Sequence, residues 1–573
     1  MGECYFRFLQ LRWCRPKLSL SSLGSKVIQH KFLFWTLEVV GGVSAIGFTT
    51  PIKGNQFVYM ARLKQSISGS PTNDWFLSTP DSNPIFTAIC KILVIGNSYL
   101  LVNVFNALLI LISFHFLNES ARVVLRIANR SRDHLFLICI SILGLCVFSP
   151  DFHNGIAGMG IFSPQFQPSS FDGLLLISIL SIVKSTSYPD YKLNIPQIIL
   201  PIVIAVTVHP SIIVSACIVL MALLIGASRI STIVLQKPFL ARYCLLVLTL
   251  IVLPYLVISY SIEEFIYSQS ELEAFRYLAY DRIPYHVVPS NFMNPFEIVR
   301  LLIVLMGTYF VFRSTMLETR LKNFLLFLTT LFMYLSISVS IIDRPVFSLT
   351  VPWRISGVLY PLFALILLWK LLVKSSDAKS ARSLKHWVFQ LTGLSIFLIA
   401  QNMSKFLLVF LALLLLRTNY FEGREDGLSK IKIKRGIGLL CTLCISLGLG
   451  IMAQVSTSQA WRENPEGFPA ATSLRKLELQ GIGVVPPQFD NFRVDFGLSI
   501  FVDSKAPPFD GKSLVEWVRR LKLAERVQTH PKILCTESSF VIISWALIPN
   551  QSALPHCFTD TIHLNKDWVL LRK

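Results

Sequence analysis

The chain is poor in charged residues. Asp, Glu, Lys and Arg make up 15% of its 573 residues, whereas an ordinary soluble protein carries roughly 25%. Hydrophobic residues make up 53%, and the mean hydropathy is +0.58. Apolar runs almost free of charge recur from about residue 32 to residue 454. Because only lipid removes the need for a polar face on every helix, this pattern excludes an ordinary soluble chain and predicts a membrane protein.

Several motifs that would identify a reaction are also absent. The sequence has no P-loop, no Gly-x-Gly-x-x-Gly after a strand, no zinc-ligand spacing and no nucleophile elbow. No small-residue cleavage site follows the basic N-terminal 31 residues, so the first apolar run is interpreted as a retained helix. No residue set identifies a metal site, and the participation of a divalent metal ion is left open.

Thirteen apolar runs are interpreted as membrane-spanning helices. They cover residues 32–49, 98–117, 135–149, 173–183, 194–208, 211–226, 243–260, 296–312, 324–342, 355–369, 387–400, 405–416 and 436–454. The predicted fold class is therefore an α-helical polytopic membrane bundle over residues 1–454, followed by a C-terminal soluble α/β domain over residues 455–573.

The net charge of +20 lies on one side of this bundle. With the N-terminus in the cytoplasm, the cytoplasmic segments hold 29 basic and 9 acidic residues, and the rest of the chain holds 24 of each. That asymmetry follows the positive-inside rule. The basic clusters are therefore interpreted as topology determinants and not as a nucleic-acid surface. A multi-pass protein of the cell membrane, with its N-terminus in the cytoplasm and its tail outside, is predicted.

The tail has the pattern of one α/β domain. Strands are expected at 481–485, 498–503 and 540–547, and residues 559–564 and 568–571 read as a closing hairpin. A helix with Ser513 as N-cap is expected at 513–526. Cys535 and Cys557 are the only cysteines here, and they either form a disulfide or remain free.

The elaborated loops all lie on the predicted outer side, where loops commonly carry function. Asp74 and Asp81 in the first outer loop are carboxylates that either activate a hydroxyl or bind a metal, or simply form turns. Arg282 and His286 lie in a proline-stiffened loop and would suit a phosphate, although an interfacial loop against lipid headgroups is the alternative. Arg354 follows Pro-Trp at the outer end of a span, where it either contacts phosphate or reaches the headgroups.

The layout resembles the GT-C superfamily of membrane glycosyltransferases, which have a long first outer loop and a soluble C-terminal domain outside. Shorter stretches are similar to those of uncharacterised bacterial multi-spanning proteins, namely Asn55-Gln56-x-x-Tyr59-Met60, Asp74-Trp75-Phe76-Leu77 with Asp81, Arg282-x-Pro284-Tyr285-His286-x-x-Pro289, Pro486-Pro487-x-Phe489-x-x-Phe492-Arg493, Val502-Asp503-x-Lys505 and Glu516-Trp517. The resemblance implies glycosyl transfer from a polyprenyl-phosphate-linked sugar at the outer leaflet during cell-envelope glycan assembly. Asp74 would be the catalytic base or a metal ligand, and Arg282, His286, Arg354 and Asp81 would bind substrate.

One departure from the GT-C pattern bears on activity. The acidic residue that those enzymes place early in the first outer loop corresponds here to Asn55-Gln56, and neither side chain is a base. Either Asp74 takes that role, or the chain has no transferase chemistry. Two other functions therefore stay open: a lipid or polysaccharide transporter or export component, and a membrane scaffold whose outer domain binds a partner.

The topology yields a first testable prediction. The N-terminus, Arg126, Lys379 and Lys432 should lie in the cytoplasm, and Asp74, His286 and the tail should lie outside, because the basic loops are retained inside. Single cysteines placed at these positions can be probed in intact cells with a membrane-impermeant thiol reagent. Labelling of position 379 from outside would contradict this topology.

Overall fold

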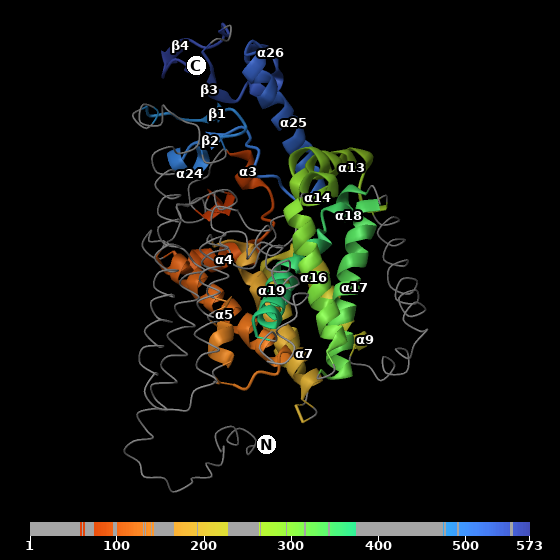
Figure 1. The fold of residues 1–573 in the computed structure, drawn as a ribbon. Coiled ribbons are helices and arrows are strands. Elements are labelled where there is room, and N and C mark those ends of the chain that lie inside the picture. The colour runs from red at the N-terminus through yellow and green to blue at the C-terminus, as the bar shows by residue number, and fades with distance from the viewer. Residues whose placement is uncertain are drawn as a thin grey trace, which may run out of the picture.

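The structure, a computed structural model, describes residues 58–141, 166–226, 263–373 and 474–573, apart from short gaps within each range. The described part consists of a set of apolar helices and a small sheet that lies with helix α25 at one end of them (Figure 1). The spans expected at 32–49, 243–260, 387–400, 405–416 and 436–454 lie outside the described residues, and the span expected at 135–149 is described only in part.

The long apolar helices coincide with predicted spans. They are α5 (Leu100–Val124), α7 (Leu175–Ser187), α8 (Ile195–Val208), α9 (Ile213–Gly226), α16 (Pro295–Arg313), α17 (Thr319–Ile341) and α19 (Ser356–Val373). Four helical stretches within the described ranges are long and apolar enough to cross a membrane, at 104–124, 168–187, 319–341 and 345–370. The membrane-protein prediction is supported, while the count of about thirteen spans stays a prediction.

Short helices connect these spans. They are α3 (Trp75–Ser78), α4 (Pro84–Leu93), η2 (Pro168–Leu174), η3 (Pro210–Ile212), α13 (Gln269–Arg276), η5 (Tyr277–Arg282), α14 (Pro284–Val287), α15 (Pro289–Phe292), α18 (Pro345–Ser348) and η6 (Pro352–Ile355). Seven of them begin with proline, whose fixed φ suits the first helical position and whose missing N–H costs nothing there.

Helix α19 is the centre of the bundle. Within the candidate span from 345 to 370, 94% of the most apolar stretch is buried inside the protein. Helix α16 packs on α19 at Gly307, where an added Cβ would come within 2.6 Å of the Phe363 side chain. A glycine at this position therefore permits the close approach of the two helices, as small residues do in membrane bundles.

Three loops that are predicted to be cytoplasmic meet at one end of the bundle. Arg126 after α5, Ser314 after α16 and Lys370 near the end of α19 line one common pocket. The sheet lies at the opposite end (Figure 1). This relative placement agrees with the charge analysis, and the assignment of each end to a side of the membrane stays a prediction.

The tail forms a five-stranded mixed sheet in the order β2-β1-β3-β5-β4. Its strands are β1 (Ile482–Val484), β2 (Ser499–Ile500), β3 (Ile543–Pro549), β4 (Asp560–His563) and β5 (Trp568–Arg572). Strand β1 pairs in parallel with β2 and β3, whereas β5 pairs antiparallel with β3 and β4. The predicted α/β class of the tail and its closing hairpin agree with this sheet.

Two details of the predicted tail were wrong. Helix α25 spans Gly511–Thr529, and its N-cap is Asp510, whose carboxylate accepts a hydrogen bond from Ser513 N, so Ser513 is not the cap. The strand expected from residue 540 begins at Ile543, because Phe540 belongs to a short 3-10 turn, η9 (Ser538–Phe540). Two further short helices complete the tail, α24 (Phe492–Phe496) and α26 (Ile533–Thr536).

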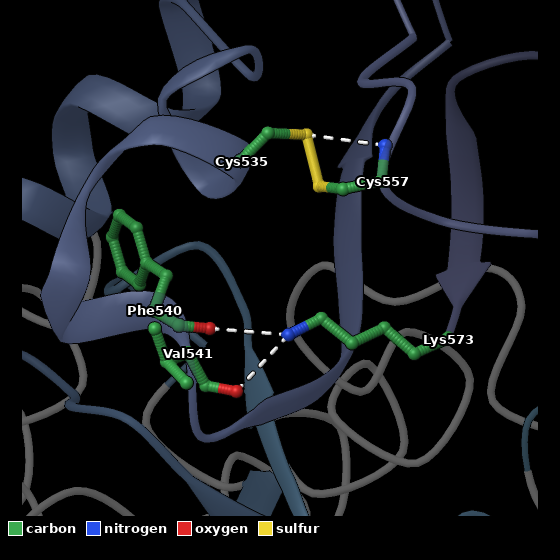
Figure 2. Close-up of a disulfide and its surroundings, with 5 residues drawn as sticks. All are labelled: Cys535, Phe540, Val541, Cys557 and Lys573. Carbon is green, nitrogen blue, oxygen red and sulfur yellow. Dashed lines mark hydrogen bonds between the residues drawn. A yellow bond between two sulfur atoms is a disulfide. The ribbon is translucent and has the colours of Figure 1, made fainter.

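The two tail cysteines form a disulfide. Cys535 and Cys557 are bridged with their Cα atoms 5.6 Å apart (Figure 2). Near this bridge, the Nζ of the last residue, Lys573, donates to the carbonyl oxygens of Phe540 and Val541 at 3.4 and 3.1 Å. Disulfides persist in oxidising compartments, which agrees with a tail outside the cell membrane.

The core of the tail continues into an outer loop of the bundle. Ala274, Phe275 and Leu278 of the α13–η5 segment are buried in the same hydrophobic cluster as Trp517 and Leu521 of α25. Helices α13 and α25 lie side by side (Figure 1). The boundary expected at residue 455 therefore does not separate two independent cores, since the tail core uses residues from the bundle.

We expect Phe275→Ala to destabilise the tail within the full-length protein. Removing a buried phenylalanine side chain typically costs about 3–5 kcal/mol, and Phe275 is only 4% exposed. Pulse proteolysis in a urea series, on protein in nanodiscs, can follow residues 474–573 as a fragment. Phe265→Ala, in the same loop but 91% exposed, is the matched control. Equal urea midpoints for both variants would show that the tail core does not depend on α13.

Candidate functional site

Asp74 is buried in an ion pair that joins the first outer loop to the tail. Its carboxylate accepts hydrogen bonds from Phe76 N at 3.0 Å, which caps α3, and from Ile500 N at 3.1 Å. It also accepts from Arg493 Nε at 2.6 Å, and its exposed fraction is 1%. Arg493 makes a second ion pair with buried Asp503. These contacts favour a structural role for Asp74 over the predicted role of base.

A second arginine stiffens the same loop. Arg62 donates to the carbonyl and hydroxyl oxygens of Thr79 at 2.9 Å each. The guanidinium carbons of Arg62 and Arg493 lie 4.3 and 5.1 Å from the centroid of the Phe76 ring, within the range of cation–π attraction. Burial lowers the pKa of Arg62; Asp81 and Asp74 raise it, and the nearby Arg493 lowers it further. Asp81 is therefore close enough to act on this arginine.

A polar cluster lies where α8 turns into α9. His209 ends α8, and its Nδ1 lies 2.7 Å from Oδ1 of Asp172, which belongs to η2. Its Nε2 lies 2.6 Å from Ser211 Oγ in η3 and 3.5 Å from a terminal nitrogen of Arg354. That same nitrogen of Arg354 is 3.8 Å from Asp172 Oδ2. Asp172 and His209 are 3% and 9% exposed, so the cluster is almost closed to solvent.

Tyr59 connects this cluster with the first loop. Burial raises the pKa of the Tyr59 hydroxyl, while the charge of Arg354 lowers it and that of Asp81 raises it. Tyr59 is therefore within electrostatic reach of both charges. Asp81 itself accepts a hydrogen bond from Asn83 N at 2.9 Å in the turn before α4. Of the two loop carboxylates, Asp81 is the one associated with Arg354 through Tyr59.

Arg282 and His286 lie in the loop that precedes α16. Arg282 contacts Glu525 of α25 at 3.5 Å, so its charge is directed towards the tail. The carbonyl oxygen of His286 accepts a hydrogen bond from Trp353 Nε1 at 2.9 Å, which places His286 beside the residue preceding Arg354. A phosphate-binding role for Arg282, His286 and Arg354 stays a prediction.

Asp172, His209 and Ser211 are not among the site residues predicted from the sequence. The signal was present: His209-Pro210 marks a tight turn between two apolar runs, and a carboxylate at the edge of a span is costly unless it is paired. Among the residues that the structure describes, no group of three or more His, Cys, Asp or Glu side chains converges to hold a metal ion.

No protein-family model and no curated protein matches the sequence. Two solved structures are similar, both of ArnT from Cupriavidus metallidurans. The structure bound to undecaprenyl phosphate has a TM-score of 0.45 at 12% identity, and the apo structure has 0.44 at 13%; each comparison covers 96% of this chain and 98% of ArnT. At these TM-scores the similarity carries no argument about fold, ligand or reaction.

We expect Arg493→Ala to loosen the tail from the first loop. Removing one partner of a buried ion pair typically costs about 3–5 kcal/mol, because the remaining carboxylates stay buried without a counter-charge. Hydrogen–deuterium exchange should therefore quicken by at least about a hundredfold at the amides of Phe76 and Ile500, which bond to Asp74. Arg519→Ala, which removes an exposed ion pair with Glu516, should leave these amides unchanged. Unaltered protection in Arg493→Ala would mean that the ion pair does not hold the two parts together.

Proposed function

We propose that this chain binds a polyprenyl-phosphate-linked sugar at the outer leaflet and transfers the sugar, as the resemblance to GT-C membrane glycosyltransferases implies. The observation that carries the proposal is the incomplete hydrogen bonding of the Arg354 guanidinium. Its Nε is buried without a hydrogen-bond partner among the described residues, and its nearest carboxylate oxygen is 3.8 Å away. A buried guanidinium with unused donors is suited to grip phosphate oxygens in a bidentate manner.

The surroundings of Arg354 support the same ligand. The side chains of Tyr59, His209 and Ser211 can donate or accept hydrogen bonds around a phosphate. Asp81 of the first loop would face the acceptor, because Asp74 is already engaged by Arg493. Arg282 and His286 would complete the contacts from the following loop once the ligand is present. The proposal does not assign a divalent metal ion to the phosphate.

The position of the cluster suits a lipid-linked substrate. Helices α8 and α9 expose apolar side chains next to it, including Val203 at 48% and Ile213 at 53%. Lipid can cover such side chains, so a polyprenyl chain would lie along α8 and α9 while its phosphate enters the polar cluster. The first loop and the tail, tied together by Arg493, would cover the sugar from outside.

Arg354→Ala should weaken binding of a radiolabelled polyprenyl-phosphate sugar about ten- to a hundredfold, since a charge-assisted hydrogen bond contributes on the order of 1.5–3 kcal/mol. The assay uses purified protein in nanodiscs. Arg354→Lys keeps the charge but not the planar fork and should lie between wild type and Ala. Arg282→Ala measures the second predicted contact.

Arg519→Ala serves as the matched control, because that arginine lies on the exposed side of α25 and pairs only with tail residues. Its affinity should equal that of wild type. If Arg354→Ala and Arg282→Ala both bind as tightly as the control, the phosphate site does not exist here. The transporter and scaffold alternatives would then stand ahead of glycosyl transfer.

A further inference from the structure

We propose that Asp172, His209 and Ser211 form a proton relay that makes the Ser211 hydroxyl a nucleophile towards carboxylic esters at the membrane surface. This activity goes beyond sugar transfer and does not require it, although both use the surroundings of Arg354. The three side chains come from two segments, since Asp172 precedes α7 while His209 and Ser211 occupy the turn between α8 and α9.

The two hydrogen bonds of His209 have a defined direction. An ionised carboxylate only accepts hydrogen bonds, so Asp172, 2.7 Å from Nδ1, requires that Nδ1 carry the proton. In the neutral ring Nε2 is then an acceptor, and the Ser211 hydroxyl, 2.6 Å away, donates to it. This is the order carboxylate, imidazole, hydroxyl that activates a serine in acyl-transfer enzymes.

Burial keeps this order in place. Asp172 is 3% exposed and His209 is 9% exposed, so water competes little for either bond. Ser211 is half-buried and follows the exposed Pro210, so its hydroxyl is the member of the relay that lies nearest the surface. A substrate therefore meets the hydroxyl first, with the base behind it.

A positive charge lies beside the relay, where it would favour a developing oxyanion. A terminal nitrogen of Arg354 lies 3.5 Å from His209 Nε2, the atom that also bonds Ser211 Oγ. Helix α9 begins two residues after Ser211, so the positive end of its dipole lies beside the same hydroxyl. Donors and dipoles fixed near a developing oxyanion are commonly the largest contribution to catalysis of acyl transfer.

The chemical step is a two-stage ester hydrolysis. Ser211 Oγ forms a bond with the ester carbonyl carbon as its proton passes to His209 Nε2, and the ester C–O bond breaks as that proton is delivered to the leaving alcohol. Water then attacks the acyl-serine and gives one proton to Nε2; the acid departs and the proton returns to Ser211. The net change is ester plus water to acid plus alcohol. The exposed apolar flank of Val203 and Ile213 suits an ester with an acyl chain.

A fluorophosphonate probe tests the relay without any knowledge of the natural ester. Purified full-length protein in nanodiscs is incubated with the probe, the adduct is located by mass spectrometry, and labelling rates are measured. We expect a single adduct on Ser211, formed with loss of fluoride. His209→Gln and Asp172→Asn should slow labelling at least about a hundredfold, the usual contribution of a positioned base. Hydrolysis of p-nitrophenyl butyrate should follow the same order.

Ser215→Ala is the matched control, one turn further along α9, where the hydroxyl is buried and makes no hydrogen bond within the described residues. It should label like wild type, and Ser211→Ala should not label at all. The proposal is overturned if wild type gives no Ser211 adduct while a known serine hydrolase in the same nanodiscs labels fully. It is also overturned if His209→Gln and Asp172→Asn, shown to be monodisperse, label at the wild-type rate. Wild-type protein that forms the Ser211 adduct but binds no radiolabelled polyprenyl-phosphate sugar would keep this activity and remove the proposed sugar transfer.

Discussion

The ion pair between Arg493 and Asp74 is the constraint on which the outer part of the structure depends. It joins residues 419 positions apart, with the Arg493 Nε 2.6 Å from the carboxylate and both side chains nearly closed to water. Two buried charges are favourable only while they are paired and hydrogen-bonded. The first loop and the tail must therefore become ordered together.

The shared core of α13 and α25 also attaches the tail to the bundle. Phe275, together with Ala274 and Leu278, contributes to a hydrophobic cluster whose other buried members belong to the tail. An apolar contact and an ion pair differ in how they resist separation: the first is non-directional and the second holds one geometry. Together they attach the tail at two points, one to the first loop and one to the segment that carries Arg282 and His286.

The fold could be predicted further than the site. Apolar runs and the one-sided distribution of basic residues predict membrane helices because lipid imposes the same requirement on each of them. Short apolar runs bounded by turn residues located β1, β3 and the final hairpin. The site depends on contacts that no local pattern encodes. Nothing in the sequence around Asp74 shows that Arg493 will occupy it, and Asp172 meets His209 only through the packing of η2 against the end of α8. Arg354 was identified because an arginine at the edge of an apolar run is conspicuous.

Arg354 links the two proposed activities, because its guanidinium lies close to both Asp172 and His209 and would also bind an anionic ligand. Its distance of 3.8 Å from Asp172 Oδ2 is longer than a hydrogen bond, so the cation is only partly compensated by that carboxylate. A phosphate bound to Arg354 would occupy the space beside His209 Nε2, which is also the atom that bonds Ser211 Oγ. The two proposed ligands would therefore compete for one cluster.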